Sequence, residues 1–241
     1  MIMEEIMKIG IIGAMDIEVA ALKDIMADAE IKTISTVDFY SGTINGAEVI
    51  AAVAGVGKVN AAVTAQTMIL TYKPDYIINI GVAGGLRADF KIGDIAVAES
   101  VVEHDMDTTA IGDPIGLISG LDTVNIKCDE RLSKIMLEAA NSVDGIKAVS
   151  GVIASGDQFI STNEARKKII DNFGAIAAEM EGASVGHVCA MNNVKFGVMR
   201  AISDGANDDS HMDYPTFAKI AAANSVKIAV KVIGDLNNGK N

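Results

Sequence analysis

The sequence predicts an α/β protein with a single domain, in which helices flank a central mixed β-sheet. Short runs rich in Ile, Val and Ala alternate with helical patterns along the 241 residues, an order typical of parallel strands joined by helices. Asn45-Gly46, between two apolar runs, adds an antiparallel hairpin. Aromatic residues make up only 4% of the chain, and Ala, Ile, Val and Met predominate instead, as expected for helices packed on buried strands.

The first two predicted elements are a strand and a helix. Residues 8–12 are apolar after Lys8, which is typical of a buried strand. Asp16 or a neighbour can cap a helix, and an apolar stripe at helical spacing extends that helix to about Ala29. The strand therefore leads almost directly into a helix, as in a βα unit.

A hairpin and a second helix follow. The runs 39–44 and 49–54 flank Asn45-Gly46, the strongest short-range hairpin signal. A helical pattern over 59–72 ends at Lys73-Pro74, because proline cannot continue a helix.

Beyond Pro74 the same two kinds of segment recur, without an internal repeat or a linker. Strands are predicted at 75–80, 95–102, 148–154, 176–178 and 196–202, and helices at 132–142, 164–172, 183–191 and 217–233. Residues 105–127 carry turn residues without a clear period and are predicted to form a long loop. We therefore expect residues 1–241 to form one domain.

The charge balance excludes some classes of partner. Lys and Arg total 20 and Asp and Glu total 32, which gives a formal net charge of −12. Nucleic acid is therefore not expected as a partner, because phosphate binding needs a basic patch. No apolar run approaches the roughly 18 residues of a membrane span, and acidic residues precede the first apolar run, unlike a secretory signal. We expect a cytoplasmic protein with no membrane partner.

Two glycine-rich turns suggest close approach of the backbone to a ligand. Gly55-Val56-Gly57-Lys58 lacks both the earlier glycine and the following Ser or Thr of a phosphate-binding loop. It is better explained as a tight turn between a strand and a helix. Gly81–Gly85 closes a predicted strand, and its glycines permit close backbone approach.

The sequence gives little support for a metal site or for a serine-hydrolase site. His104, His187 and His211 have no ligand spacing among them. No Gly-x-Ser-x-Gly elbow is present. We expect no metal and no cofactor.

Carboxylates at strand ends point to acid/base chemistry. Glu18 lies one turn into the first helix, and Arg200 to Asp204 end another apolar strand. Glu179 and Glu181 follow a short apolar run, and alternate residues of an extended segment face the same side. In α/β sheets ligands collect at the carboxyl ends of strands. Caps and salt bridges would also account for these residues, so the pattern alone leaves the function open.

The motifs together resemble the 5′-methylthioadenosine/S-adenosylhomocysteine nucleosidases of the nucleoside phosphorylase-like superfamily. The resemblance extends from Lys8 to about Val232, and several linked motifs in order make it specific. They are KIGIIGAMDIEV at 8–19, GVGKVNAA at 55–62, PDYIINIGVAGGL at 74–86, SGDQFI at 155–160, AAEMEGASVGHVC at 177–189 and RAISDGAN at 200–207.

The resemblance implies cleavage of an N-glycosidic bond by water, with an adenine nucleoside as substrate and three carboxylates at the centre. Glu18 would activate the water, Asp204 would protonate N7 of the departing adenine, and Glu181 would hold the ribose hydroxyls. Such a reaction passes through a cationic sugar and needs one carboxyl that stays protonated. The further binding residues implied are Met15, Val56, Ala83, Gly84, Phe159, Ile160, Met180, Arg200, Ser203 and Tyr214.

The chain departs from the family at several positions. Val82 stands where the family usually has Ser, and Ile111, Asp113 and Ser119 stand where it places aromatic residues and a proline. The preference among methylthioadenosine, S-adenosylhomocysteine and 5′-deoxyadenosine is therefore open. Residues 1–6 extend beyond the family's usual start. The family also implies a homodimer, and the loop at 105–127 is a reasonable interface.

Three alternatives remain. A phosphorylase on the same fold would need a cationic phosphate site, and only Arg87 and Arg200 lie in matching stretches, while Glu18 would repel a phosphate dianion. A hydrolase of another adenine nucleoside, such as aminofutalosine, fits the divergent loop. An inactive nucleoside-binding protein is the most distant alternative, because both Glu18 and Asp204 are present.

Overall fold

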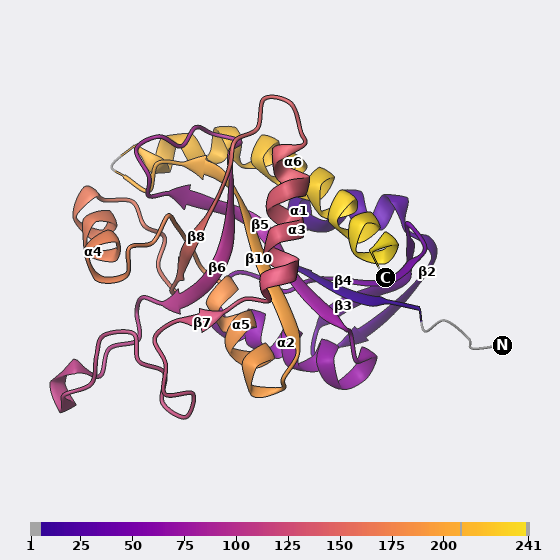
Figure 1. The fold of residues 1–241 in the computed structure, drawn as a ribbon, viewed down its shortest axis with the longest axis horizontal. Helices are drawn as coiled ribbons and strands as arrows, with labels where there is room; N and C mark the ends of the chain where they lie inside the picture. Colours follow the sequence, from indigo (N-terminus) through magenta and orange to yellow (C-terminus); the bar gives the residue numbers. More distant parts are fainter. Residues whose placement is uncertain (1–5, 208, 240–241) are drawn as a thin grey trace.

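Ten strands joined in one sheet form the centre of the computed structural model, which describes residues 6–207 and 209–239 (Figure 1). The strands are β1 (Lys8–Gly13), β2 (Ala27–Ile34), β3 (Val37–Ile44), β4 (Ala47–Val53), β5 (Tyr76–Gly85), β6 (Ile95–Glu103), β7 (Ile126–Lys127), β8 (Ala148–Ser155), β9 (Ala177–Glu179) and β10 (Lys195–Asp204). Residues 1–5 of the predicted N-terminal extension lie outside the described part of the chain.

The sheet is mixed and partly closed. Its order is β10-β6-β8-β9-β5-β1-β4-β3-β2, with β7 paired to β6, and β10 also pairs with β5. This second pairing closes β5, β10, β6, β8 and β9 into a ring, from which β1, β4, β3 and β2 extend. The pairs β1–β4, β1–β5 and β5–β10 are parallel, whereas β2–β3, β3–β4 and β6–β10 are antiparallel. The predicted mixed sheet is therefore confirmed.

Helices cover both faces of the sheet, as predicted. They are α1 (Asp16–Ile25), α2 (Lys58–Tyr72), α3 (Glu130–Asn141), α4 (Asn163–Phe173), α5 (Gly182–Met191) and α6 (Ser210–Asn238), with a short 3-10 helix η1 (Thr109–Ile111). One apolar core packs α1, α3 and α6 on the sheet, and another packs α2 and α5 on the other side (Figure 1). No helix in the described ranges is long and apolar enough to cross a bilayer.

The helix predicted to reach Ala29 ends instead at Ile25, and the sequence analysis missed β2. The apolar stripe is misleading here, because Ile25 is exposed and Ala27–Ile34 pairs with β3 at the edge of the sheet. All but the last residue of β2 are exposed. The strand therefore lacks the alternation that marks a half-buried strand.

Two other boundaries differ in ways that affect the site. Gly81–Gly85 does not close a strand but continues β5, where it pairs with β10 and β9. The last helix begins at Ser210, before Pro215, and extends past the predicted end to Asn238. The long loop predicted at 105–127 is present, interrupted by η1 and ending in β7.

Candidate active site

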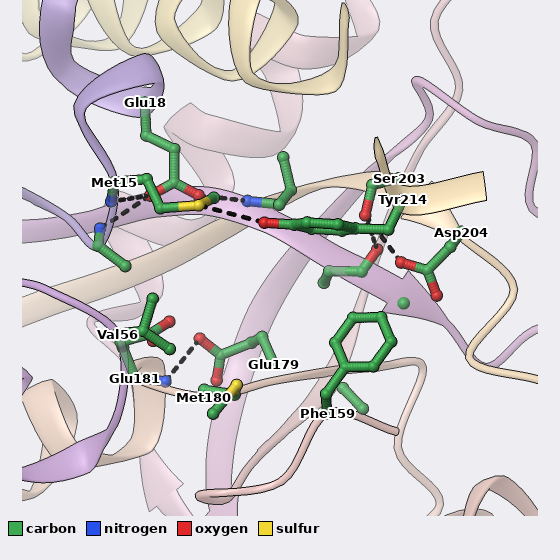
Figure 2. Close-up of a pocket in the computed structure, with 15 residues that line it drawn as sticks. Met15, Glu18, Val56, Phe159, Glu179, Met180, Glu181, Ser203, Asp204 and Tyr214 are labelled. Carbon is green, nitrogen blue, oxygen red and sulfur yellow. Dashed lines mark hydrogen bonds between the residues drawn. The ribbon is translucent and has the colours of Figure 1, made fainter. Parts of the chain in front are cut away.

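A cleft of about 180 Å³ lies where the parallel strands β1, β5 and β10 end. The glycines at the end of β5 leave room for Glu18 from α1 and for Asp204 from the end of β10. Figure 2 shows side chains from α1, β9, β10 and α6 converging on this space. The residues that line it are Ala14, Met15, Glu18, Val56, Val82, Ala83, Gly84, Phe159, Ala178, Glu179, Met180, Glu181, Ser203, Asp204 and Tyr214.

Glu18 is held by backbone amides at one end of the cleft. Its Oε2 accepts hydrogen bonds from the amides of Ala14 at 2.8 Å and Met15 at 2.9 Å, and its Oε1 accepts from Val82 at 3.1 Å. The side chain is only 2% exposed. Burial raises the pKa of Glu18, although the Arg200 charge and these amides oppose the rise. A fixed carboxylate with a raised pKa suits removal of a proton from water.

Gly81 makes room for this carboxylate. A Cβ at Gly81 would lie 2.6 Å from Oε1 of Glu18. The glycines at 81–85 are expected from the sequence to permit close approach of a ligand, and at Gly81 the approaching group is a side chain of the protein itself.

The two glutamates after β9 have different partners. Glu179 pairs with Arg200, whose Nε lies 3.0 Å from Oε2, and it accepts hydrogen bonds from the Ser155 hydroxyl and the Gly182 amide. Glu181 accepts one from the Gly57 amide at 2.9 Å, and its Oε2 lies 3.9 Å from Arg200 Nη2. Both line the cleft, but the carboxylate oxygens of Glu179 are occupied by the buried arginine and its other donors. Glu181 has fewer hydrogen-bond partners and can therefore accept more hydrogen bonds from a ligand.

Burial and the neighbouring charge of Glu179 raise the pKa of Glu181 from 4.5 to about 7. The Arg200 charge and the Gly57 amide act in the opposite direction. A carboxylate with such a pKa changes its charge near neutral pH and gains from hydroxyl donors or a nearby cation.

Asp204 lies at the end of β10, opposite Gly84. The register with β5 shifts between Ile202 and Asp204, an irregularity that re-aims side chains at strand ends. The Ser203 hydroxyl donates to Oδ2 of Asp204 at 2.9 Å, and the Ala206 amide donates to Oδ1 at 2.8 Å. The carboxyl group is thereby fixed in the cleft wall.

An apolar wall faces these carboxylates. The rings of Phe159 and Tyr214 pack edge to face, with their centroids 5.6 Å apart. The Tyr214 hydroxyl lies 3.1 Å from Sδ of Met15 (Figure 2). Beyond Asp204 the cleft adjoins a smaller cavity of about 30 Å³, which Phe159 and Ile160 line. The site thus offers a flat apolar surface next to a carboxyl group.

Most of the predicted site residues line the cleft, with two exceptions. Ile160 lies in the adjoining cavity. Arg200 is 1% exposed and lies behind the lining, because its guanidinium is engaged by Glu179 and Asn79. Arg200 thus lies beside Glu181, as expected, but its contact with the cleft passes through the glutamates, and its part in binding a ligand stays a prediction.

The structure adds three participants that the sequence analysis did not assign. Gly57 contributes its amide, Glu179 balances the buried arginine, and Ser155 bridges Glu179 and the Ala183 amide. Glu179 and Gly57 stood in motifs already singled out, but no pattern indicated which carboxylate would meet the arginine.

The described lining of the cleft carries carboxylates but no cationic side chain. Within the described ranges none of its lining residues is Lys or Arg, and Arg87 pairs with Asp89 at 2.9 Å. No group of three or more His, Cys, Asp or Glu side chains in the described ranges is arranged to hold a metal ion. The chemistry available is that of carboxyl groups, backbone amides and aromatic rings.

The chain is similar over most of its length to proteins of one family. The model of the phosphorylase superfamily matches residues 8–234. A 5′-methylthioadenosine/S-adenosylhomocysteine nucleosidase from Geobacillus is 37% identical over 95% of this chain and 99% of its own. A nucleosidase of the same name from Neisseria meningitidis, solved with methylthio-immucillin-A, is 31% identical, with a TM-score of 0.92 over 95% of this chain and 99% of its own. A futalosine hydrolase from Helicobacter pylori is 35% identical, with a TM-score of 0.91 over 95% of this chain and 98% of its own.

Proposed function

The chain belongs to the phosphorylase superfamily, and we propose that it hydrolyses the N-glycosidic bond of 5′-methylthioadenosine and S-adenosylhomocysteine. The products are adenine and the 5-thioribose sugar. The observation that carries this proposal is the convergence of Glu18, Glu181 and Asp204 on one cleft whose described lining includes no Lys or Arg. The relatives named as nucleosidases support the same substrates.

Glu18 is assigned as the general base. Water attacks C1′ of the ribose as the bond from C1′ to N9 breaks, and Glu18 takes the proton that the water loses. Its raised pKa makes it a better base than an exposed glutamate while its amide donors keep the carboxylate in place. The charge of Glu18 also opposes binding of a phosphate dianion at the same place.

Asp204 is assigned as the general acid. It would deliver its proton to N7 of adenine as the base departs, so that the electrons of the broken bond remain on a neutral leaving group. The Ser203 hydroxyl orients the carboxyl group. Phe159, with Ile160 beside it, would provide the surface on which adenine stacks.

Glu181 is assigned to the ribose hydroxyls. A carboxylate that accepts hydrogen bonds from both hydroxyls also stabilises the positive charge that develops on the sugar. Arg200 would act from behind by pairing with Glu179, so that its positive charge offsets part of the repulsion between Glu179 and Glu181.

The remaining lining residues are assigned to the sugar and its 5′-substituent. Met180 and the Ala83-Gly84 backbone would contact the ribose, and Tyr214, with Met15 and Val56, would cover the 5′ side. The group at the 5′ position thus lies against apolar side chains.

A homodimer would complete the 5′ side of the site. Val59 and Ile111 are 73% and 80% exposed, and Val56 is half exposed at the mouth of the cleft. Large exposed apolar residues, at the start of α2 next to the turn that bears Val56 and in the 105–127 loop, fit surfaces covered by a partner. A solution mass of twice 25.1 kDa is expected, and a monomeric mass at working concentration would contradict this assembly.

We place the enzyme in the cytoplasm. Cys128 and Cys189 are both free thiols, which fits a reducing compartment.

Futalosine-type nucleosides are the second candidate substrates, favoured by the futalosine hydrolase among the structural relatives. Such hydrolysis would use the same carboxylates and differ only on the 5′ side.

The proposal is tested by adenine release from methylthioadenosine, S-adenosylhomocysteine, 5′-deoxyadenosine and aminofutalosine. Chromatography of the products gives kcat/KM for each substrate. The highest values are expected for the two thio-nucleosides. A protein that releases adenine only from aminofutalosine, or from none of the four, would contradict the proposal.

A further inference from the structure

Three charged residues outside the cleft lining form a closed set of contacts, here called the anchor cluster: Lys58, Asp105 and Asp157. Lys58 Nζ lies 2.7 Å from Oδ1 of Asp105. The other oxygen of Asp105 accepts a hydrogen bond from the Asp157 amide at 2.9 Å. The Asp157 side chain in turn accepts one from the Lys58 amide at 2.8 Å. Asp157 is therefore held at both its backbone and its side chain.

The cluster holds a segment that packing does not hold. Residues 157–159 are exposed, whereas Gly156 and Ile160 on either side are buried. Phe159 itself is 49% exposed and touches Tyr214 only edge to face. Because little apolar surface fixes this segment, the hydrogen bonds at Asp157 have a large share in setting where Phe159 lies.

The cluster also connects this segment to the ribose side of the cleft. The two adjacent amides at the start of α2 bind one carboxylate each: Gly57 binds Glu181 and Lys58 binds Asp157. A side chain at Gly57 would place its Cβ 2.9 Å from Oδ1 of Asp157, at a φ of +99°. The turn therefore brings both carboxylates to one helix end, where the dipole favours negative charge.

We propose that Asp105 is a positioning residue for binding of the base, acting through Asp157 to hold Phe159 over the cleft. This inference rests on the proposed function, in which Phe159 stacks on adenine. Stacking is present in both the bound substrate and the transition state, so its loss weakens binding without slowing the chemical step. Asp105 lies outside the cleft lining and need not contact the substrate.

The test compares Asp105→Ala with Glu103→Gln. Glu103 Oε2 also contacts Lys58, at 3.1 Å, but its other oxygen faces His187 rather than the 155–160 segment. For methylthioadenosine, Asp105→Ala is expected to raise KM about tenfold with kcat within about threefold, the size of one lost charge-assisted hydrogen bond. Glu103→Gln is expected to leave both constants within about twofold, and Asp105→Asn, which keeps an acceptor oxygen, to recover part of the loss. Equal KM values for wild type and Asp105→Ala would overturn the proposal.

A double-mutant cycle separates positioning from a general structural role. In a Phe159→Ala background, Asp105→Ala is expected to raise KM no further, because the ring through which it acts is gone. If Asp105→Ala raised KM in that background by the same factor as in the wild type, the proposal would be overturned.

Amide hydrogen exchange tests the same inference without turnover. The amides of residues 157–160 should exchange faster in Asp105→Ala than in the wild type, and at the wild-type rate in Glu103→Gln. Wild-type exchange rates in Asp105→Ala would overturn the role of Asp105. If the wild type released no adenine, the proposed function would fail. Exchange and the dissociation constant for adenine would still decide whether Asp105 positions this segment.

Discussion

Glu18 and Glu181 are both buried carboxylates, but their surroundings differ in how many donors face them. Glu18 accepts three backbone hydrogen bonds, whereas Glu181 accepts one and faces the neighbouring charge of Glu179. The first is thus prearranged as a fixed base. The second is left short of partners until a ligand supplies hydroxyl groups or positive charge.

Asp204→Asn tests the source of the proton for the leaving group. The amide keeps the shape of the side chain but cannot deliver the proton, so kcat for methylthioadenosine should fall by roughly 10²–10⁴-fold. Adenine release gives kcat, and an unchanged melting temperature shows that the fold is intact. The p-nitrophenyl glycoside of 5-methylthioribose has a leaving group that departs without protonation. Its kcat should therefore fall far less in the variant. Near-normal turnover of methylthioadenosine by the variant would contradict the assignment.

Glu181→Gln tests how much the buried, ionised carboxylate of Glu181 lowers the free energy of unfolding. In the unfolded chain this carboxyl ionises near pH 4.5, but in the folded chain it keeps its proton to about pH 7. The folded state therefore binds more protons between these values, and stability is lost as the pH rises through them. The glutamine variant escapes this loss, so at pH 8 its free energy of unfolding should exceed that of the wild type by up to about 3 kcal/mol.

Urea denaturation at pH 8 and pH 4.5 measures this difference. The gap between variant and wild type should close at the lower pH, where the wild-type carboxyl is protonated. A variant less stable than the wild type at pH 8 would mean that the Gly57 amide and Arg200 stabilise the charged carboxylate after all.

At the scale of elements, the end of β5 connects sheet geometry to catalysis. Gly81 leaves space for Glu18, and Gly84 leaves space for Asp204, whose Oδ1 would lie 3.0 Å from an added Cβ. The same strand pairs with β1, β10 and β9. One strand therefore sets the places of both proposed proton-transfer groups.

Gly81→Ala is expected to displace Glu18 and to lower kcat by about 10- to 100-fold through loss of the positioned base. Affinity for adenine should change little, because Phe159 and Ile160 lie at the other end of the site. In a Glu18→Gln background the substitution should cost nothing more. An equal further loss in that background would show that Gly81 acts on something other than Glu18.

The elements predicted from the sequence are those with an apolar run, an apolar stripe or a strong local turn signal. The hairpin around Asn45-Gly46 and the helix at 59–72 follow from local chemistry, and the structure confirms them. β2 was missed because an exposed edge strand has no apolar period, and because the two-residue turn that pairs it with β3 is formed by Ser35 and Thr36 at positive φ rather than by Asn-Gly. The end of β5 was missed because glycines suggest a turn, although partners on both sides keep them extended here.

The candidate site follows the same distinction. The positions of Glu18, Glu181 and Asp204 in one cleft could be predicted from the linked motifs. The engagement of Arg200 by Glu179 could not, because which of two alternate carboxylates turns to a buried cation depends on the three-dimensional path of the chain.

For the whole molecule, closure of the ring of β5, β10, β6, β8 and β9 joins strands that are far apart in sequence. The sequence predicted a mixed sheet, but not that β10 would pair on both of its edges. That double pairing places the end of β10, with Asp204, beside the ends of β5 and β9. The site is thus a product of the closed topology rather than of any single βα unit.

The most direct test of the account is the sugar product of methylthioadenosine cleavage with and without inorganic phosphate. Because Glu18 prepares a water and no described Lys or Arg lines the cleft, the expected product is free methylthioribose with adenine, at a rate indifferent to phosphate. Methylthioribose-1-phosphate, formed only when phosphate is present, would show that phosphate is the nucleophile and would contradict the role of Glu18.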